Sequence, residues 1–448
     1  MKVQRDGRNV TVEVTSDGEG LVSHAGSALL VQIADKSGLT SALSVRLAGL
    51  KQRDSGHDPG RVVRDLAVML ADGGDCLADL GAVRDQDALF GAVASDSSAF
   101  RVIDKIATTP GLLDALGDAH ARAREHVWTQ AGAPERMTID IDATLVTSHS
   151  DKEGAAGTYK GGYGFHPLMA YCDETGEALA ALLRPGNAGS NTAADHIAVI
   201  QDALAQVPDE LIETIEIVVR TDSAGATHEV MDFCREHRLR YSAGYELTDQ
   251  VRAAILKIPD ATWVCALASD GSPRENGQIA EITTSLDLSG WPTGSRVIVR
   301  RERAHPGAQL SFTDHDGHRF QAVLTDQSSP DIQILERCQR ERAHAETQIR
   351  NDKDTGLRNM PFRDFEHNRV WLALVGIAHD LLVWTQRLLL TGELARCEPK
   401  RLRYRLLRVA ARLSFHARKA TLRIDHAWPW ATALVDAFAR ARALSAPV

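Results

Sequence analysis

Three charged residues, Arg342, Glu346 and Lys353, stand four and then seven positions apart. In an α-helix these steps turn the chain by about 400° and 700°, so the three side chains lie on one stripe of the helix. One interpretation is a solvated helix, in which Arg342 pairs with Glu346 and Glu346 pairs with Arg350. The other is a carboxylate held between two cations for chemistry on a phosphate. The remainder of the sequence has to decide between them.

Further carboxylates accompany two segments that are expected to be strands. Asp140 and Asp142 lie in MTIDIDATLVTS, and they face the same side because side chains alternate along a strand. Asp222 follows TIEIVVR, a short apolar run of the kind that is buried at the centre of a sheet. The carboxyl end of such a strand is where α/β folds place their chemistry.

The order of elements from residue 137 predicts where these carboxylates meet. The strand MTIDIDATLVTS is followed by a hairpin formed by HPLMAYC and EALAALL, and then by a helix over 190–206. The strand TIEIVVR, the helix ATHEVMDFCREH and the strand LRYSAGY complete the series. Three antiparallel strands followed by alternating helix and strand are the order of a ribonuclease H-like fold. In that fold the first strand, the end of the fourth strand and a late helix converge at one edge of the sheet.

Asp142, Asp222 and Glu346 would repel one another at that edge unless a cation neutralised them. Hard carboxylate oxygens suit Mg²⁺ or Mn²⁺. Two such ions can activate the attacking oxygen and stabilise the leaving oxygen of a phosphodiester. The sequence therefore predicts a two-metal nuclease centre, in which Arg342 and Lys353 hold the phosphates that flank the scissile bond. Asp140 is expected to support the metal ligands.

The remaining parts of the sequence predict regions that flank this core or are inserted into it. Residues 1–130 carry helical patterns broken by glycine, which indicate a mainly helical domain. Strand-like stretches between 262 and 325, the last a hairpin around Asp316-Gly317, predict an all-β insertion over 251–330. Residues 370–390 predict a buried helix and no membrane span, because they include a histidine, an aspartate and an arginine. The core is therefore expected over 131–250 and 331–390, with a basic helical region over 391–448.

Charge is distributed unevenly along the chain. The 448 residues carry a net charge of −9, but residues 331–448 hold 21 Lys and Arg against 13 Asp and Glu. Nine of these cations lie between Lys400 and Arg423, among leucines spaced as on a helix, and such a face can neutralise phosphates. No secretory signal is recognised at MKVQRDGRNV, so the protein is expected to be cytoplasmic.

Several motifs together resemble the DDE transposases of bacterial insertion sequences, in the branch with a β insertion and an Arg-x3-Glu-x6-Lys signature. They are DIDATLV at 140–146, GFHPLMAY at 164–171, RPGNAGSNTAADH at 184–196, RTDSAG at 220–225 and the signature at 342–353. The resemblance covers residues 137 to about 390. It departs from the family at Gln339, where the family often has a tyrosine three residues before the arginine.

The resemblance implies that Asp142, Asp222 and Glu346 are the three catalytic acids, with two Mg²⁺ or Mn²⁺ ions as cofactors. It implies cut-and-paste transposition of double-stranded DNA, in which hydrolysis at the element's end frees a 3′-hydroxyl that attacks target DNA. The N-terminal domain is expected to recognise the terminal inverted repeats, and a homodimer is expected on paired ends in a nucleoid-associated bacterial protein. The residues expected to contact DNA are Arg342, Arg350, Lys353, Arg300, Arg301 and Arg303, with Trp291 as a base-stacking side chain.

Two other functions fit parts of the sequence. Asp140-Ile-Asp142-Ala-Thr144 matches the Asp-x-Asp-x-Thr of aspartate-nucleophile phosphatases. That class needs a later acidic pair, whereas the pair Asp75 and Asp79 precedes the motif. A catalytically silent DNA-binding descendant of a transposase is the other alternative, and it would be expected to have lost an acid or a signature cation.

Overall fold

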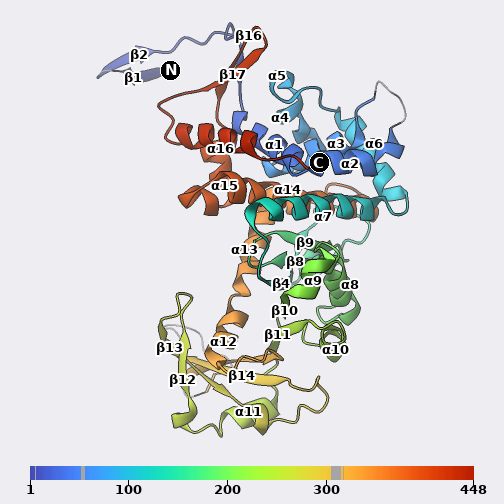
Figure 1. Ribbon diagram of the computed structural model, residues 1–448, viewed down its shortest axis with the longest axis vertical. Helices are drawn as coiled ribbons and strands as arrows, with labels where there is room; N and C mark the ends of the chain where they lie inside the picture. Colours follow the sequence, from blue (N-terminus) through green and yellow to red (C-terminus); the bar gives the residue numbers. More distant parts are fainter. Residues whose placement is uncertain (6, 52–55, 304–313, 316, 448) are drawn as a thin grey trace.

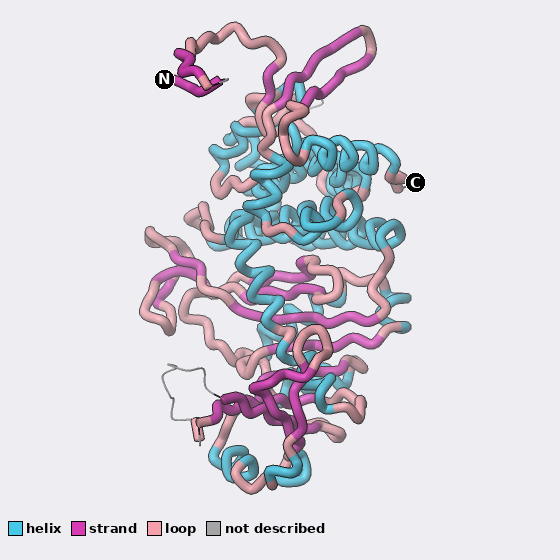
Figure 2. Tube along the Cα trace, turned by 90° about the vertical axis from the view of Figure 1, so that its left-hand side faces the viewer, coloured by secondary structure: helices cyan, strands magenta, loops and turns pink. Residues whose placement is uncertain are grey.

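The structure is a computed structural model that describes residues 1–5, 7–51, 56–303, 314–315 and 317–447. The molecule is elongated (Figure 1). Helices from both ends of the chain gather at one end, a sheet occupies the middle, and most of the strands of residues 264–325 lie at the other end. Figure 2 shows the same three levels from the side.

A nine-stranded mixed sheet runs through the middle and lower levels, in the order β12-β13-β14-β15-β11-β10-β4-β8-β9. Its core strands are β4 (Arg136–Ala143), β8 (Leu168–Cys172), β9 (Ala178–Leu182), β10 (Glu216–Thr221) and β11 (Arg240–Tyr245). β4 pairs antiparallel with β8 and parallel with β10, and β10 pairs parallel with β11. The predicted ribonuclease H-like order of strands is confirmed.

The insertion continues this sheet. Its strands are β12 (Val264–Leu267), β13 (Pro273–Glu281), β14 (Arg296–Arg303) and β15 (His318–Thr325). β15 pairs antiparallel with both β11 and β14, so the predicted β insertion joins the core through main-chain hydrogen bonds. The turn predicted at Asp316-Gly317 includes a residue outside the described ones.

Helices cover both faces of the sheet. α8 (Ala193–Leu204) and α10 (His228–Glu236) lie on one side, and α12 (Ile332–Arg340) and α13 (Ala343–Asp352) lie on the other (Figure 1). The side chain of Asp331 accepts a hydrogen bond from the Gln333 N–H and so caps α12. After α13 comes a π-helical turn, Lys353–Leu357. Its helical geometry breaks at Thr355 and Gly356, and the φ of 100° at Gly356 would be strained for other residues.

The helical level is built around α14 (Phe365–Leu389), which holds the fully buried Trp371 and Trp384. This helix is long and apolar enough to cross a membrane by composition, but 67% of its most apolar window is buried inside the molecule. It is the core helix predicted over 370–390. The helices around it are α1 (Ala28–Lys36), α2 (Leu39–Arg46), α3 (Pro59–Ala71), α6 (Asp96–Thr108), α7 (Leu112–Ala131) and α16 (Ala431–Ala443).

Short elements complete the described chain. The strands are β1 (Lys2–Arg5), β2 (Arg8–Thr11), β3 (Leu21–Val22), β5 (Val146–Thr147), β6 (Ala156–Gly157), β7 (Tyr163–Phe165), β16 (Ala411–His416) and β17 (Lys419–Ile424). The helices are α4 (Gly81–Arg84), α5 (Asp87–Phe90), α9 (Asp209–Thr214), α11 (Asp249–Ile255) and α15 (Pro399–Leu402).

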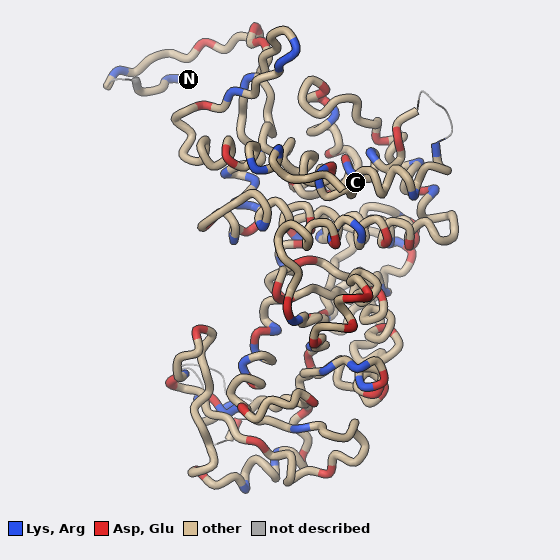
Figure 3. Tube along the Cα trace, viewed as in Figure 1, with Lys and Arg blue, Asp and Glu red and all other residues tan. Residues whose placement is uncertain are grey.

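The helix predicted over the basic stretch 400–423 is wrong for most of its length. α15 passes into a π-helical turn, Arg403–Leu407, and the chain then forms the antiparallel hairpin of β16 and β17. Alternation also fits ARLSFH and KATLRI, and pairing with β3 satisfies one edge of the hairpin. Lys and Arg therefore lie on α15 and along the hairpin, not on one helical face (Figure 3).

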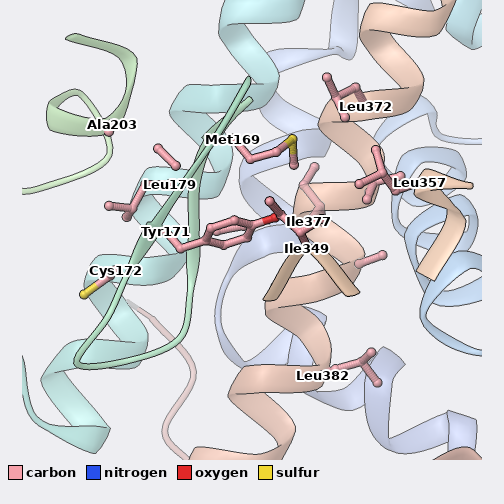
Figure 4. Packing of buried hydrophobic residues seen from close by; sticks show 14 of the residues in the cluster. Met169, Tyr171, Cys172, Leu179, Ala203, Ile349, Leu357, Leu372, Ile377 and Leu382 are labelled. Atoms are coloured by element: carbon pink, nitrogen blue, oxygen red, sulfur yellow. The ribbon is translucent and has the colours of Figure 1, made fainter. Parts of the chain in front are cut away.

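A buried polar cluster fastens α13 to the sheet and to α14. Tyr171 on β8 points from the sheet toward Ile349 and Ile377 (Figure 4). Its hydroxyl donates to Asp352 Oδ2 over 2.5 Å, and His379 Nδ1 on α14 lies 2.5 Å from Asp352 Oδ1. His379 Nε2 lies 2.8 Å from the carbonyl oxygen of Gly176, so a protonated His379 donates from both ring nitrogens.

This cluster predicts a pH-dependent stability. Burial lowers the pKa of His379, but the Asp352 carboxylate outweighs it and the pKa is raised to about 9. Because this folded-state pKa lies above the unfolded value near 6.5, the stabilisation is complete below about pH 6.5 and is lost as the pH rises through 9. We expect the free energy of unfolding in urea to fall on the order of a few kcal/mol more between pH 6 and pH 9.5 in the wild type than in His379→Gln.

The exposed His416 provides the control, since His416→Gln should keep the wild-type pH dependence. Equal pH dependence in His379→Gln and the wild type would contradict the assignment.

Candidate active site

Three carboxylates from distant parts of the sequence line one cavity of about 400 Å³. They are Asp142 at the end of β4, Asp222 just after β10, and Glu346 in the first turn of α13. β4 and β10 are parallel neighbours, so their carboxyl ends lie at the same edge of the sheet. α13 packs against β4 and β8 and brings Glu346 to that edge. The convergence of the three acids at the sheet edge is therefore present in the structure.

Arg342 connects two of these acids. Its Nη1 lies 3.2 Å from Asp142 Oδ2, and its Nη2 lies 2.9 Å from Glu346 Oε1. The pair that the solvated-helix interpretation expects, Arg342 with Glu346, is therefore present. The same guanidinium also contacts a carboxylate on the neighbouring strand, so it belongs to the site as well as to the helix.

The electrostatics of the cavity favour a cation. Burial is the largest influence on Asp142 and raises the pKa of its carboxyl, and the charges of Asp222 and Glu346 raise it further. Arg342 and the hydrogen bond from the Ala143 N–H act in the opposite direction. A carboxylate destabilised by two like charges is stabilised by any positive charge that enters the cavity.

The donor set fits a divalent metal ion. Asp142, Asp222 and Glu346 offer only hard carboxylate oxygens, and Glu346 is exposed. The oxygens of the three acids are not gathered within 4.8 Å of one another, because the Arg342 guanidinium lies between Asp142 and Glu346.

Among the described residues, the one group of possible metal ligands that does lie within 4.8 Å is Asp75, Cys76 and Asp79. There Asp79 Oδ2 accepts hydrogen bonds from the N–H groups of Asp75 and Cys76. This carboxylate caps a turn. The acidic pair weighed for a phosphatase thus belongs to a turn that follows α3 in the helical level.

Asp140 does not line this cavity. It is buried, and its carboxylate receives Arg220 Nε at 2.5 Å and Arg220 Nη2 at 2.7 Å. Arg220 also lies 2.8 Å from Asp173 Oδ2, donates to the carbonyl oxygen of Cys338, and Asp173 Oδ1 lies 2.7 Å from His344 Nδ1. Burial raises the pKa of Asp140 to about 7, against the opposing effect of Arg220. Asp140 therefore links β4 to β10, and its role as a support for the metal ligands stays a prediction.

The two remaining cations of the α13 region lie apart from the carboxylates. Arg350 is exposed, and its Nη2 lies 3.2 Å from Glu398 Oε1. Lys353 lines a second cavity, but burial, Arg358 and Lys160 lower its pKa while Asp142 raises it. Lys353 therefore lies within electrostatic range of the active-site cavity.

The insertion residues predicted to contact DNA do not line this cavity, but Arg300 lines a neighbouring cavity together with Asp222 and Arg342. Arg300 bonds to Glu336 and Gln321. The guanidinium of Arg301 lies 4.3 Å from the ring centroid of Trp263, and Arg303 is exposed at the end of β14.

Trp291, expected to stack on a base, stacks on the ring of His228 with centroids 4.1 Å apart. It also meets the edge of Tyr245 at 5.7 Å.

Sequence reasoning missed several residues of the cavity wall. Lys160 and Tyr159 line it from the glycine-rich loop before β7, and His166 and His196 line it from buried positions. Burial lowers the pKa of both histidines, which favours their neutral forms near pH 7. The lysine in TYKGGYG is a sequence signal, because a cation in a glycine-rich loop that follows the strand bearing Asp142 suits a phosphate ligand.

Gln339, the departure from the family pattern, has a structural role here. Its Oε1 accepts from the Ser242 hydroxyl at 2.7 Å, and its Nε2 donates to the Thr221 carbonyl at 2.8 Å. It therefore links α12 to β10 and β11 directly behind Asp222.

Comparison with known proteins identifies one family. The description "Transposase DDE domain group 1" matches residues 4–446 of the chain. A cryo-EM structure of the piggyBac transposase synaptic complex with hairpin DNA aligns with a TM-score of 0.43 and 10% identity, covering 86% of this chain and 80% of that chain. No curated protein sequence matches.

The buried Arg220 predicts a large loss of stability in Arg220→Ala. Breaking a buried ion pair leaves Asp140 buried without its cation, which costs about 3–5 kcal/mol. Arg350→Ala, which removes a surface pair, should cost at most about 1 kcal/mol. Unfolding in urea measures both, and equal costs would show that Arg220 does not hold the sheet to α12.

Proposed function

Because this chain belongs to the family of group 1 transposase DDE domains, and is therefore a DDE transposase, we propose that Asp142, Asp222 and Glu346 are its catalytic acids. The reaction proposed is cut-and-paste transposition, with hydrolysis at the ends of the element followed by attack of the freed 3′-hydroxyl on target DNA. The observation that supports it is the shared cavity. Asp142 and Asp222 are 80 positions apart in the sequence, and Asp222 and Glu346 are 124 positions apart, yet all three line one cavity at the sheet edge.

DDE transposases generally use divalent metal ions. We propose that Asp142, Asp222 and Glu346 hold two Mg²⁺ or Mn²⁺ ions. When bound, such ions polarise a phosphoryl oxygen and lower the pKa of the attacking hydroxyl or water.

The protein's own side chains then position the phosphate. Arg342, which bridges Asp142 and Glu346, presents a planar guanidinium that can bind two phosphate oxygens once the carboxylates have another cation. Lys160, which also lines the cavity, adds positive charge. The neutral, buried His166 and His196 limit the water around the reacting atoms and fix the wall.

The partners proposed are double-stranded DNA at the terminal inverted repeats and at the target, with a homodimer on paired ends. The N-terminal domain over 1–130 is proposed to recognise the repeats. The contacts of Arg300 with Glu336 on α12 and of Arg301 with Trp263 make both residues part of the framework, whereas the exposed Arg303 and Arg350 are the stronger candidates for DNA backbone contacts. The protein is proposed to act in the bacterial cytoplasm. A silent DNA-binding descendant is less well supported, because all three acids and Arg342 are in place.

A plasmid excision assay tests the three acids, with the DNA that flanks the gene as the element ends. Asp142→Asn, Asp222→Asn and Glu346→Gln should each lower excision roughly a thousand-fold or more, because metal ligands contribute several kcal/mol and each 1.4 kcal/mol is tenfold. Asp140→Asn should retain part of the activity.

Glu229→Gln, at an exposed carboxylate on α10, is the matched control and should excise as the wild type does. An inactive Asp140→Asn together with an active Asp142→Asn would assign the first acid to Asp140 instead. Wild-type protein that binds the ends but never excises would favour the silent descendant.

Metal binding can be measured independently of excision. Isothermal titration with Mn²⁺ should give binding to the wild type that weakens at least tenfold in Asp142→Asn, since a ligand is lost. Binding should also weaken as the pH is lowered, because the raised pKa of Asp142 brings a proton into competition with the ion. Unchanged Mn²⁺ affinity in Asp142→Asn would remove this residue from the metal site.

A further inference from the structure

A second cavity, of about 690 Å³, lies between the helical level and the end of α13. We call it the Arg403 cavity. Its walls come from the turn after α3, the π-helical turn after α13, and the segment that joins α15 to the β16–β17 hairpin. It is lined by Gly73, Gly74, Asp75, Lys353, Asp354, Gly356, Arg358, Lys400, Arg403, Tyr404, Arg408, Val409, Ala410, Asp425 and Trp428.

The lining of the Arg403 cavity is predominantly cationic. Five of its residues are Lys or Arg and three are Asp. Of the three acids, Asp354 is already shared between Arg358 Nη2 at 2.8 Å and Lys400 Nζ at 3.0 Å. The side chains of Arg358 and Lys400 are 60% and 62% exposed, so they remain accessible to an anion. A polyanion is the ligand that this balance of charge suits.

Arg403 is built into the floor of the cavity. It is buried, its Nε donates to the Ala71 carbonyl at 2.8 Å, and its Nη2 donates to the Thr355 hydroxyl at 3.1 Å. Gly73 keeps this floor open. It has a φ of 97°, and a Cβ there would lie 2.7 Å from Arg408 Nη2 and 3.0 Å from Arg403 Nε. A buried cation on a floor that admits no side chain is a preformed site for an anionic group.

An aromatic platform borders the same cavity. The Tyr404 ring is 65% exposed, and it meets the edges of Trp428 and Trp430 with centroids 5.6 Å and 6.0 Å apart. Trp428 is held in place because its Nε1–H donates to the Arg405 carbonyl at 2.9 Å. An exposed ring backed by two fixed rings suits stacking on a base, and only a base outside the duplex stack presents its face.

Lys353 joins the Arg403 cavity to the active site. It follows Glu346 by seven residues along one helix, which is about 10 Å of helix axis. It lines the Arg403 cavity, and its pKa responds to Lys160 and Asp142 of the active-site cavity. Since one DNA strand carries a phosphate about every 3.4 Å of axis, the distance corresponds to roughly three nucleotides.

We propose that the Arg403 cavity receives the DNA strand a few nucleotides from the scissile phosphate. Lys353, Arg358, Lys400 and Arg403 hold its phosphates, and Tyr404 stacks on one unpaired base. This inference rests on the proposed function, because it takes the active-site cavity as the place of cleavage. Because a base can stack on Tyr404 only outside the duplex, the C-terminal segment 399–430 would help to open the duplex. This role is in addition to any role of Trp291 in the insertion.

Photocrosslinking locates the strand. Duplexes of the DNA that flanks the gene, with 5-iododeoxyuridine placed singly at each of the nucleotides around the cleavage position, are bound by the full chain and irradiated. The expected result is a crosslink to a peptide within 399–430 from positions about two to five nucleotides away from the scissile phosphate. Crosslinks from these positions that map only to other peptides overturn the proposal.

Variants test the consequence for the reaction. Tyr404→Ala should lower excision about 5- to 100-fold, and Tyr404→Phe, which keeps the ring, should restore it to near the wild-type level. Lys400→Ala should lower excision more than Lys105→Ala, which removes an exposed lysine from α6. Tyr404 and Lys400 are exposed, so the thermal unfolding of both variants should match the wild type. Wild-type excision in Tyr404→Ala and Lys400→Ala overturns the proposal.

A separate measurement distinguishes failure of the proposed function from failure of this inference. Mn²⁺-dependent nicking of supercoiled plasmid reports the metal site, and it should be lost in Asp142→Asn but unchanged within about twofold in Lys105→Ala, which removes an exposed lysine outside both cavities. If the wild type does not nick, the active-site assignment fails. The crosslink map still decides the path of the strand, because crosslinking needs binding and not cleavage.

Discussion

The geometry of the site depends on the contacts of the buried Arg220 guanidinium. It lies on β10, and it contacts Asp140 on β4, Asp173 in the turn after β8, and the Cys338 carbonyl on α12. Asp173 in turn contacts His344 on α13. One buried cation therefore fixes all the elements that bear the three acids. A buried charge tolerates few alternative arrangements, since any change of register leaves it without a partner.

This framework allows the active-site cavity itself to be electrostatically unfavourable. Burial and the charges of Asp222 and Glu346 make the ionised form of Asp142 costly and raise its pKa, and Arg342 offsets only part of this. Such a site is useful for catalysis because its carboxylates gain stability from an entering metal ion or other cation. The sheet pairing and the contacts of Arg220 and Gln339 immediately behind the cavity stabilise the fold and offset this electrostatic repulsion.

The helix α13 connects the helical level to the active-site cavity. α13 carries Glu346 at one end and Asp352 at the other, and Asp352 is held by Tyr171 and His379. The next turn forms one wall of the Arg403 cavity, whose other walls come from both ends of the chain. A strand bound there, as proposed, would contact the turn that continues α13 and would couple DNA binding to the position of Glu346.

Much of the core was determined by the sequence alone. The strands around Asp142 and Asp222 and the helix around Glu346 were predictable, because alternation, apolar runs and helical spacing are local patterns. The family signature predicted the same three acids. The excess of positive charge in the C-terminal region was also visible in the sequence.

Other features were decided only by tertiary structure. Asp140 and Asp142 look equivalent in sequence, yet Arg220 takes the first into a buried ion pair and leaves the second at the cavity. The stretch 400–423 has helical spacing, but pairing with β3 and packing against the end of α3 favour a π turn and a hairpin. The Arg403 cavity joins residues more than 300 positions apart, such as Gly73 and Arg403. Local patterns cannot encode such a site, because its shape depends on which distant surfaces the chain brings together.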